Sequence, residues 1–257
     1  MISTNNTNLK FRANILRGHE VFAAHIQDQI HSVMRYQRPL LTSFLTPAEQ
    51  EIVKQLNGNK LFLSFYGGYD QAVRKIAFLA NEPMEPDYDY TILSSSYTYD
   101  KRILSHRDVL GALMNLGLQR DQIGDICVDE NEIALVCKQM ISEWICNELR
   151  FVARAPVCFQ ENFNFEWKTP ILETCSINVS SFRMDSVVAS LANISRSKAM
   201  KMIEQGMIKL NDVILEDNEQ LCHNDYVSIR GVGRFHCLGV VSKTKKDRWI
   251  LSFEKFK

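Results

Sequence analysis

Residues 182–211 read FRMDSVVASLANISRSKAMKMIEQGMIKLN, and this stretch decides how the last third of the chain folds. Apolar residues recur at three- and four-residue spacing from Met184 to Leu191, which is typical of one helix face. Ser195 is a suitable N-cap for a second helix, and Gly206 suits the end of that helix. The alternation over 207–211 then predicts a strand. We therefore predict two short helices joined by a tight turn and followed by a sheet.

The positions left outside the predicted core of this module are rich in Lys and Arg. Residues 182–257 carry 13 Lys and Arg against 9 Asp and Glu, whereas residues 1–181 carry 17 against 21. A basic module after an acidic body indicates a polyanion site, because each phosphate contact releases counterions. Lys and Arg also lie on the outside of most soluble proteins, so spacing alone leaves both interpretations open. We predict RNA contacts at Arg183, Arg196, Lys198, Lys201, Lys209 and Arg230.

A β-hairpin is predicted after these elements, with a strand through Val241 and a second strand over Trp249–Phe253. Its tip is rich in lysine, and three ammonium groups on a protruding turn favour phosphate contact over a merely solvated loop. Arg234 precedes the hairpin in a glycine-rich stretch. We predict further RNA contacts at Arg234, Lys243, Lys245 and Lys246.

The middle of the chain has a regular order of elements. The order β-α-β-β-α-β is that of a ferredoxin-like plait. Many RNA-binding proteins share this plait, but a fold does not imply a function. The aromatic signature that RNA-recognition plaits carry on their central strands is absent. The predicted elements are strand 90–99, helix 105–116, strands 123–128 and 132–137, helix 139–149 and strand 156–160.

The N-terminal region is predicted to be helical. Residues 20–36 carry apolar side chains at helical spacing, and Thr46 and Gly58 mark the start and end of a second helix. Residues 61–66 then have strand composition and run into Gly67-Gly68. A tight turn is favoured there over a phosphate cradle, because no GxGxxG or GK[ST] motif accompanies the two glycines.

Composition narrows the class of protein. No run of eighteen or more apolar residues occurs, so we expect no membrane span. Met1–Lys10 lacks the apolar core of a secretory signal. The seven cysteines are scattered without CxxC or zinc spacing, which indicates free thiols in a reducing cytoplasm. We expect no metal or other cofactor.

The C-terminal stretch resembles the S-four domain, a small RNA-binding fold named after a small-subunit ribosomal protein. The family usually has glycine at two positions where this chain has Asp212 and Asn224. Both residues tolerate a positive φ, so we expect the turns to form. The resemblance rests on Arg183–Asp185, Ser195-Arg196, Gly206–Asn211 and Asp225–Val227.

Four further segments extend the resemblance to nearly the whole chain, and they are similar to the YlmH family of bacterial S-four proteins. This resemblance implies RNA binding on the large ribosomal subunit, with tRNA as a further candidate, in the rescue of stalled, split ribosomes that hold peptidyl-tRNA. Members also carry an older description as cell-division proteins, and a photosynthetic branch is linked to photosystem assembly. The segments are Phe65–Tyr69, Ser105–Ile126, Ile229–Phe235 and Thr244–Lys246.

The string His106-Arg107-Asp108 admits several interpretations. Kinases use this triplet in a catalytic loop, but the other kinase motifs are missing and the string lies in the first turn of a predicted helix. We predict instead a second RNA patch formed by His106, Arg107 and Arg120. Two alternatives stay open. One is an RNA-modifying enzyme with a site around His106, Asp108 and Asp125, and the other is an acidic body that docks a division or assembly partner.

The predicted fold class is α+β. It comprises a helical N-terminal region (1–59), a ferredoxin-like domain (60–161), a linker (162–181) and an S-four domain with a C-terminal hairpin (182–257). We predict a monomeric, cytoplasmic, non-catalytic protein whose partners are RNA and the large ribosomal subunit, and no membrane. Because Arg196 and Lys201 are both assigned to the surface, we expect Arg196→Glu with Lys201→Glu to leave thermal stability almost unchanged.

Overall fold

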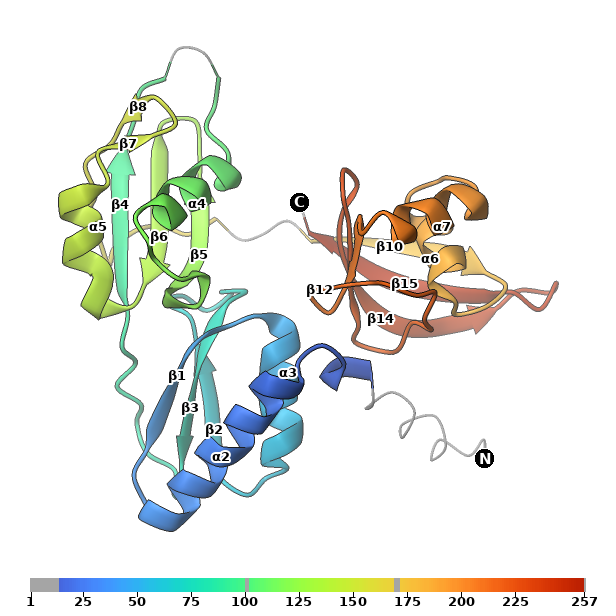
Figure 1. Cartoon of the computed structure of the whole chain (residues 1–257), viewed down its shortest axis with the longest axis horizontal. Helices are drawn as coiled ribbons and strands as arrows, with labels where there is room; N and C mark the ends of the chain where they lie inside the picture. Colours follow the sequence, from blue (N-terminus) through green and yellow to red (C-terminus); the bar gives the residue numbers. More distant parts are fainter. Residues whose placement is uncertain (1–13, 100–101, 169–171, 257) are drawn as a thin grey trace. The chain divides into compact units, whose positions relative to one another are not determined.

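The chain combines helices and strands in two compact units, seen here in a computed structural model that describes residues 14–99, 102–168 and 172–256 (Figure 1). One unit, here called the body, comprises residues 22–169, and the other, the C-terminal unit, joins residues 1–21 to 170–257. The stretch Met1–Lys10, considered above as a signal, lies outside the described residues. No helix in the described ranges is long and apolar enough to cross a membrane.

The first layer of the body is a small antiparallel sheet covered by two helices. Ile26 and Ile30 of α2 and Val53 of α3 pack on Leu45 and Leu79 of the sheet. The predicted caps of α3 are confirmed: Thr46 and Glu49 form a capping box, and Gly58 ends the helix at φ 49°. The elements are α2 (Glu20–Tyr36), β1 (Leu40–Leu45), α3 (Pro47–Asn57), β2 (Phe62–Tyr66) and β3 (Lys75–Ala80), in the sheet order β1-β3-β2.

Strand β1 was not predicted, because the whole N-terminal region (1–59) was expected to be helical. The run LLTSFL is short and has no clear helical or strand period, so its pairing with β3 is what makes it a strand. Phe44 lies opposite Ile76 in that pairing. Residues 62–80, which were expected in the ferredoxin-like domain, complete this sheet as β2 and β3.

The second layer of the body has the predicted β-α-β-β-α-β order. The final strand pairs at Gln160–Glu161, just beyond the predicted 156–160, because Ala155–Pro156 forms a separate hairpin with Phe151–Val152. Val109 and Leu113 of α4 and Ile145 of α5 pack on one face of the sheet. The main elements are β4 (Thr91–Ser96), α4 (His106–Asn115), β5 (Ile123–Val128), β6 (Glu132–Cys137), α5 (Ser142–Glu148) and β9 (Gln160–Glu161), in the sheet order β5-β6-β4-β9.

The other face of this sheet is covered as well. Ile92 and Val136 pack there against Phe44 of the first layer, and Phe165 and Trp167 pack around them. Residues 162–168, predicted as linker, therefore belong to the body. RNA-recognition plaits stack bases on this face of the sheet, so that mode of binding is closed to this domain.

The C-terminal unit is a six-stranded sheet with two helices on one face (Figure 1). Met184 and Val188 of α6 and Ile203 of α7 pack against Val227 and Phe253 of the sheet. The elements are η1 (Asn14–Leu16), β10 (Leu172–Val179), α6 (Met184–Leu191), α7 (Arg196–Glu204), β11 (Ile208–Leu210), β12 (Val213–Ile214), β13 (Tyr226–Ile229), β14 (Gly233–Lys243) and β15 (Trp249–Phe256), in the sheet order β10-β15-β14-β13-β11-β12.

Strand β10 also lies in the predicted linker. Ile177 and Val179 are buried, whereas Ser176 and Asn178 are exposed. This alternation has the period of a strand, but polar and charged residues dominate the stretch and hide it. The sequence predicted that the C-terminal unit starts at Phe182. The structure shows that it already includes β10, which lies before that residue.

The two turns that depart from the S-four pattern form as expected. Asp212 and Asn224 have φ values of 69° and 65°. Asn211 supports the turns, because its side chain donates to Asp225 at 2.8 Å and accepts from the Tyr226 N–H at 2.9 Å.

Asp225 should couple the stability of this unit to pH. Burial raises the pKa of Asp225 to about 6, although hydrogen bonds from Asn211 and the Cys222 N–H oppose the shift. Because the folded pKa exceeds the unfolded one, the folded state binds more protons between about pH 4 and pH 6, and stability falls as pH rises through this window. We expect Asp225→Asn to remove roughly 2 kcal/mol of this pH dependence, measured by urea unfolding at about pH 4 and pH 7. Parallel pH profiles for the two proteins would contradict this expectation.

Candidate RNA interface

Helix α7 presents a cationic side to solvent. Ser195 caps the helix by accepting from the Lys198 N–H at 3.2 Å, so the predicted cap is confirmed. Ala199 and Ile203 are buried, which turns Lys198 and Lys201 outward, and both are exposed. Three residues apart on a helix, these lysines lie on the same side and can meet neighbouring phosphates.

Arg183 and Arg196 lie at the same end of the helical layer, where both approach Asp185. Asp185 as a residue is 8% exposed; its carboxylate accepts from Arg196 at 3.1 and 2.6 Å, and Arg183 lies 3.5 Å away. Burial alone would raise the pKa of Asp185, but the hydrogen bonds that its carboxylate accepts from Arg196, together with the neighbouring Asn218 side chain, lower it. Arg196 therefore supports the fold as well as offering a charge. We therefore now expect Arg196→Glu with Lys201→Glu to lower stability, whereas the sequence alone led us to expect no change.

Two further predicted cations extend from the sheet. Lys209 is exposed in the middle of β11, between the buried Ile208 and Leu210, as the predicted alternation requires. Arg230 is exposed at the end of β13, and its N–H donates to the Met207 carbonyl at 3.0 Å. The backbone bonds of both residues fix where their charges emerge.

Arg234 is more enclosed than the sequence suggested. Its guanidinium pairs with Asp212 at 3.0 Å and lies 5.2 Å from the centre of the Tyr226 ring. Tyr226 in turn stacks on His236, with ring centres 4.4 Å apart. Tyr226 and His236 were not predicted as site residues, although strand alternation places both on the face of the sheet opposite the helices. Arg234 therefore joins an aromatic cluster, with only part of its charge open to a ligand.

The hairpin carries its three lysines as predicted. One of them, Lys243, contacts Trp249, which was not predicted from the sequence. Lys243 lies 3.9 Å from the centre of the Trp249 ring and pairs with Asp247 at 2.8 Å. Trp249 also contacts Phe182, with ring centres 5.3 Å apart, which ties the base of the hairpin to the start of the helical layer. Lys245 and Lys246 are exposed at the tip.

The second predicted patch is only partly assembled in the body. Desolvation and the charge of Arg120 lower the pKa of His106. Desolvation and Arg74 lower the pKa of Arg120 to about 10, and its guanidinium donates to the Gly124 carbonyl at 3.1 Å. Arg107 lines a separate groove with Arg150. The charge of Arg120 therefore acts on His106, whereas Arg107 lines a groove to which neither of them contributes.

The two carboxylates of the enzyme alternative have structural partners. Asp108 completes the cap of α4 and receives two hydrogen bonds from Arg102, at 2.7 and 2.8 Å, which together with Ser105 lower its pKa. Asp125 accepts from the Val73 N–H at 2.6 Å and from the Arg74 N–H at 3.0 Å. Both side chains therefore hold local structure.

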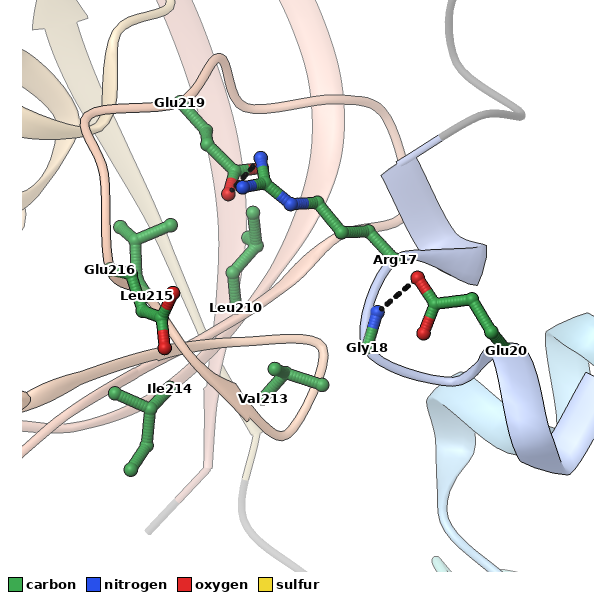
Figure 2. Close-up of a pocket in the computed structure, with 9 residues that line it drawn as sticks. All are labelled: Arg17, Gly18, Glu20, Leu210, Val213, Ile214, Leu215, Glu216 and Glu219. Atoms are coloured by element: carbon green, nitrogen blue, oxygen red, sulfur yellow. Dashed lines mark hydrogen bonds and ion pairs between the residues drawn. The ribbon is translucent and has the colours of Figure 1, made fainter.

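A groove on the C-terminal unit has the wrong charge for RNA (Figure 2). It has a volume of about 270 Å³, and its floor includes the exposed Ile214. Arg17 pairs with Glu219 at 2.6 Å, which neutralises one of its acids. The remaining carboxylates repel phosphate, so this groove lies outside the candidate interface. The groove is lined by Arg17, Gly18, Glu20, Leu210, Val213, Ile214, Leu215, Glu216 and Glu219.

Comparison with known proteins identifies the family. A family model described as "Putative RNA-binding domain in YlmH" matches residues 83–165. A Bacillus subtilis (strain 168) protein named "Ribosome-associated protein quality control protein P2" is 34% identical over 232 residues, which cover 88% of this chain and 90% of the relative. The chain belongs to the YlmH family. A solved YlmH structure, titled "Cell division protein ylmH from Streptococcus pneumoniae", is 25% identical with a TM-score of 0.49, over 56% of this chain and 90% of that one.

The region that matches the YlmH domain model contains His106, Arg107 and Arg120. It also contains the plait sheet whose second face is covered by the first layer and by residues 162–168. RNA bound by this domain of a YlmH protein must therefore use its edges, its helices or its loops.

Proposed function

We propose that this YlmH-family chain is a non-catalytic RNA-binding protein that binds structured ribosomal RNA through its C-terminal unit. The proposed arrangement is an N-terminal α/β layer, a ferredoxin-like middle domain and an S-four domain with a hairpin. The proposed setting is the large ribosomal subunit, in ribosome-associated quality control in the cytoplasm. The relative named for ribosome-associated quality control supports this setting.

One observation carries the proposal. Four exposed cations, Lys198 and Lys201 on α7, Lys209 on β11 and Arg230 directly after β13, belong to elements whose inner sides are buried in one core. Their backbones are held in place before any ligand arrives, so little conformational freedom of the chain is lost on binding. Cations held in this way can each meet a phosphate of folded RNA, two from the helix layer and two from the sheet side of the unit.

The enzyme alternative loses its support from these carboxylates. Asp108 and Asp125 already accept hydrogen bonds that cap a helix and hold a loop. A general base needs an oxygen that is open to its substrate. The middle domain is better assigned as a second RNA-contacting region that includes His106 and Arg120.

Sedimentation with ribosomal particles tests the proposal. We expect the full chain to move with large-subunit fractions on a sucrose gradient at low salt and to be released as salt is raised, because phosphate contacts are exchanged for counterions. Protein that stays at the top of the gradient at every salt concentration would overturn the ribosomal assignment. Protein that sediments with the small subunit alone would overturn the choice of subunit.

A further inference from the structure

The segment Phe65–Tyr69, one of the stretches that resembles the YlmH family, forms a turn that only glycine permits. A Cβ atom on Gly67 would lie 2.3 Å from the Arg74 carbonyl oxygen. Gly68 has a φ of +94°, and a Cβ there would lie 2.9 Å from Val136. The two glycines therefore let the backbone pass close to Arg74 and to Val136 of the sheet. This close approach fixes the position of the residues that follow them.

The first residue delivered is Tyr69, and it is held rigidly. Its hydroxyl donates to Asp125 at 2.8 Å, and burial together with the Asp125 charge raises the pKa of Tyr69, so the hydroxyl keeps its proton. The Tyr69 ring stacks on Trp167 with centres 4.3 Å apart and an interplanar angle of 0°. Phe165 supports Trp167 edge to face at 5.1 Å.

An open pocket of about 270 Å³ lies beside this stack, lined by Tyr69, Asp70, Gln71 and Trp167. Asp70 and Gln71 are both exposed, so their polar groups remain accessible to a ligand. The pocket thus combines a fixed aromatic surface with one carboxylate and one amide. Covering the sheet accounts for Tyr69 and Trp167 but not for the two polar residues beside them.

We propose that this pocket binds an unpaired guanine base of RNA. Aromatic side chains stack on any base, and single-stranded RNA is read by hydrogen bonds to the base edge. A carboxylate only accepts hydrogen bonds, and guanine alone among the four bases offers two adjacent N–H donors on its pairing edge. Asp70 takes these donors, and the Gln71 amide donates to the guanine oxygen. The inference rests on the proposed RNA-binding function and gives the body a base-reading role in it.

The charge around the pocket suits a nucleotide as well as a base. Lys168 follows Trp167 directly and is largely exposed, although it pairs with Asp129. An exposed ion pair of this kind is weak, so Lys168 can turn to a phosphate at little cost.

Photo-crosslinking of the full chain tests the inference. The probes are two short single-stranded uridine-rich RNAs, one with a single guanosine and one with adenosine at that position. Crosslinked peptides are mapped by mass spectrometry. We expect guanosine to crosslink to Tyr69 or Trp167 at least about fivefold more than adenosine, given the selectivity of two-point base contacts. Crosslinks confined to residues 172–256, or equal yields with the two probes, would overturn the inference.

A pair of variants isolates the carboxylate. Asp70→Asn should remove the guanosine preference, because the amide places a donor where guanine needs an acceptor. Asp87→Asn, at another exposed aspartate of the body, should leave it unchanged. A preference that survives Asp70→Asn would overturn the role of Asp70. Guanosine crosslinking without sedimentation on ribosomes would overturn the ribosomal proposal alone, and sedimentation without guanosine preference would overturn this inference alone.

Discussion

Lys198→Glu combined with Lys201→Glu is expected to weaken the proposed binding to large-subunit RNA by about a hundredfold at low salt, since two phosphate contacts become repulsions. Both lysines are exposed on the side of α7 opposite the buried Ala199 and Ile203. The salt dependence should become shallower by about one unit of slope for each phosphate that the variant no longer neutralises. A salt titration of RNA binding measures both quantities.

The matched control is Arg38→Glu with Lys60→Glu, which makes the same change in net charge at exposed positions of the body. If the control weakens binding as much as the α7 pair, the effect is one of overall charge and the α7 surface is not the interface. The α7 variant should unfold within about 0.5 kcal/mol of the unaltered chain, because both positions are exposed. A loss of binding can then be separated from a loss of structure.

Arg196→Glu is expected to lower the free energy of unfolding of the C-terminal unit by roughly 2–4 kcal/mol. The substitution removes the donors that satisfy Asp185 and places a second negative charge beside this buried carboxylate. Half of the Arg196 side chain is exposed, which keeps the expected loss at the lower end for a buried ion pair. Chemical denaturation at neutral pH measures the change.

Two variants separate the ion pair from the charge of α7. Lys198→Glu reverses one charge on the same helix, as Arg196→Glu does. Lys198 has no ion-pair partner among the described residues, so the stability of the Lys198→Glu variant should hardly change. Arg196→Lys keeps the charge but loses the two-point contact, and should cost less than Arg196→Glu. Equal stability for Arg196→Glu and Lys198→Glu would show that the contact with Asp185 contributes nothing. RNA contact by Arg196 is best tested with the lysine variant.

Local signals allowed much of the fold to be predicted. The capping residues Thr46, Ser105 and Ser195 mark helix starts in the sequence, and each does so in the structure. These features are readable because each depends on residues within one helical turn. The β-α-β-β-α-β order of the middle domain is readable because its periods are clear.

The parts that differ from prediction depend on distant partners. Strand β1 is fixed by pairing with β3, and β10 is fixed by pairing with β15. Phe165 and Trp167 form part of the cover on the plait sheet, and their polar neighbours gave no periodic signal. Contacts across such separations leave at most a weak local pattern, such as the alternation that polar residues hide in β10.

The candidate site shows the same division. Outward positions of Lys198, Lys201 and Lys209 follow from helix and strand periods, and the structure exposes all three. The pairing of Arg196 with Asp185 spans two helices, and the contact of Lys243 with Trp249 spans a hairpin. Neither pairing is visible in the spacing of residues. Which cations are exposed was therefore easier to predict than which of them contact another side chain.

The place of β10 in the sheet order has a consequence for folding kinetics. β10 is the first strand of the C-terminal sheet to be synthesised, yet its neighbour in the sheet is β15, the last strand to be made. During translation β10 cannot pair with β15 until the intervening helices and strands have been made. Closing the long loop between these two strands is slow. A chain arrested before Trp249 would leave β10 unpaired and β14 with an open edge, which exposes it to aggregation. We therefore infer that this unit matures late and as a whole.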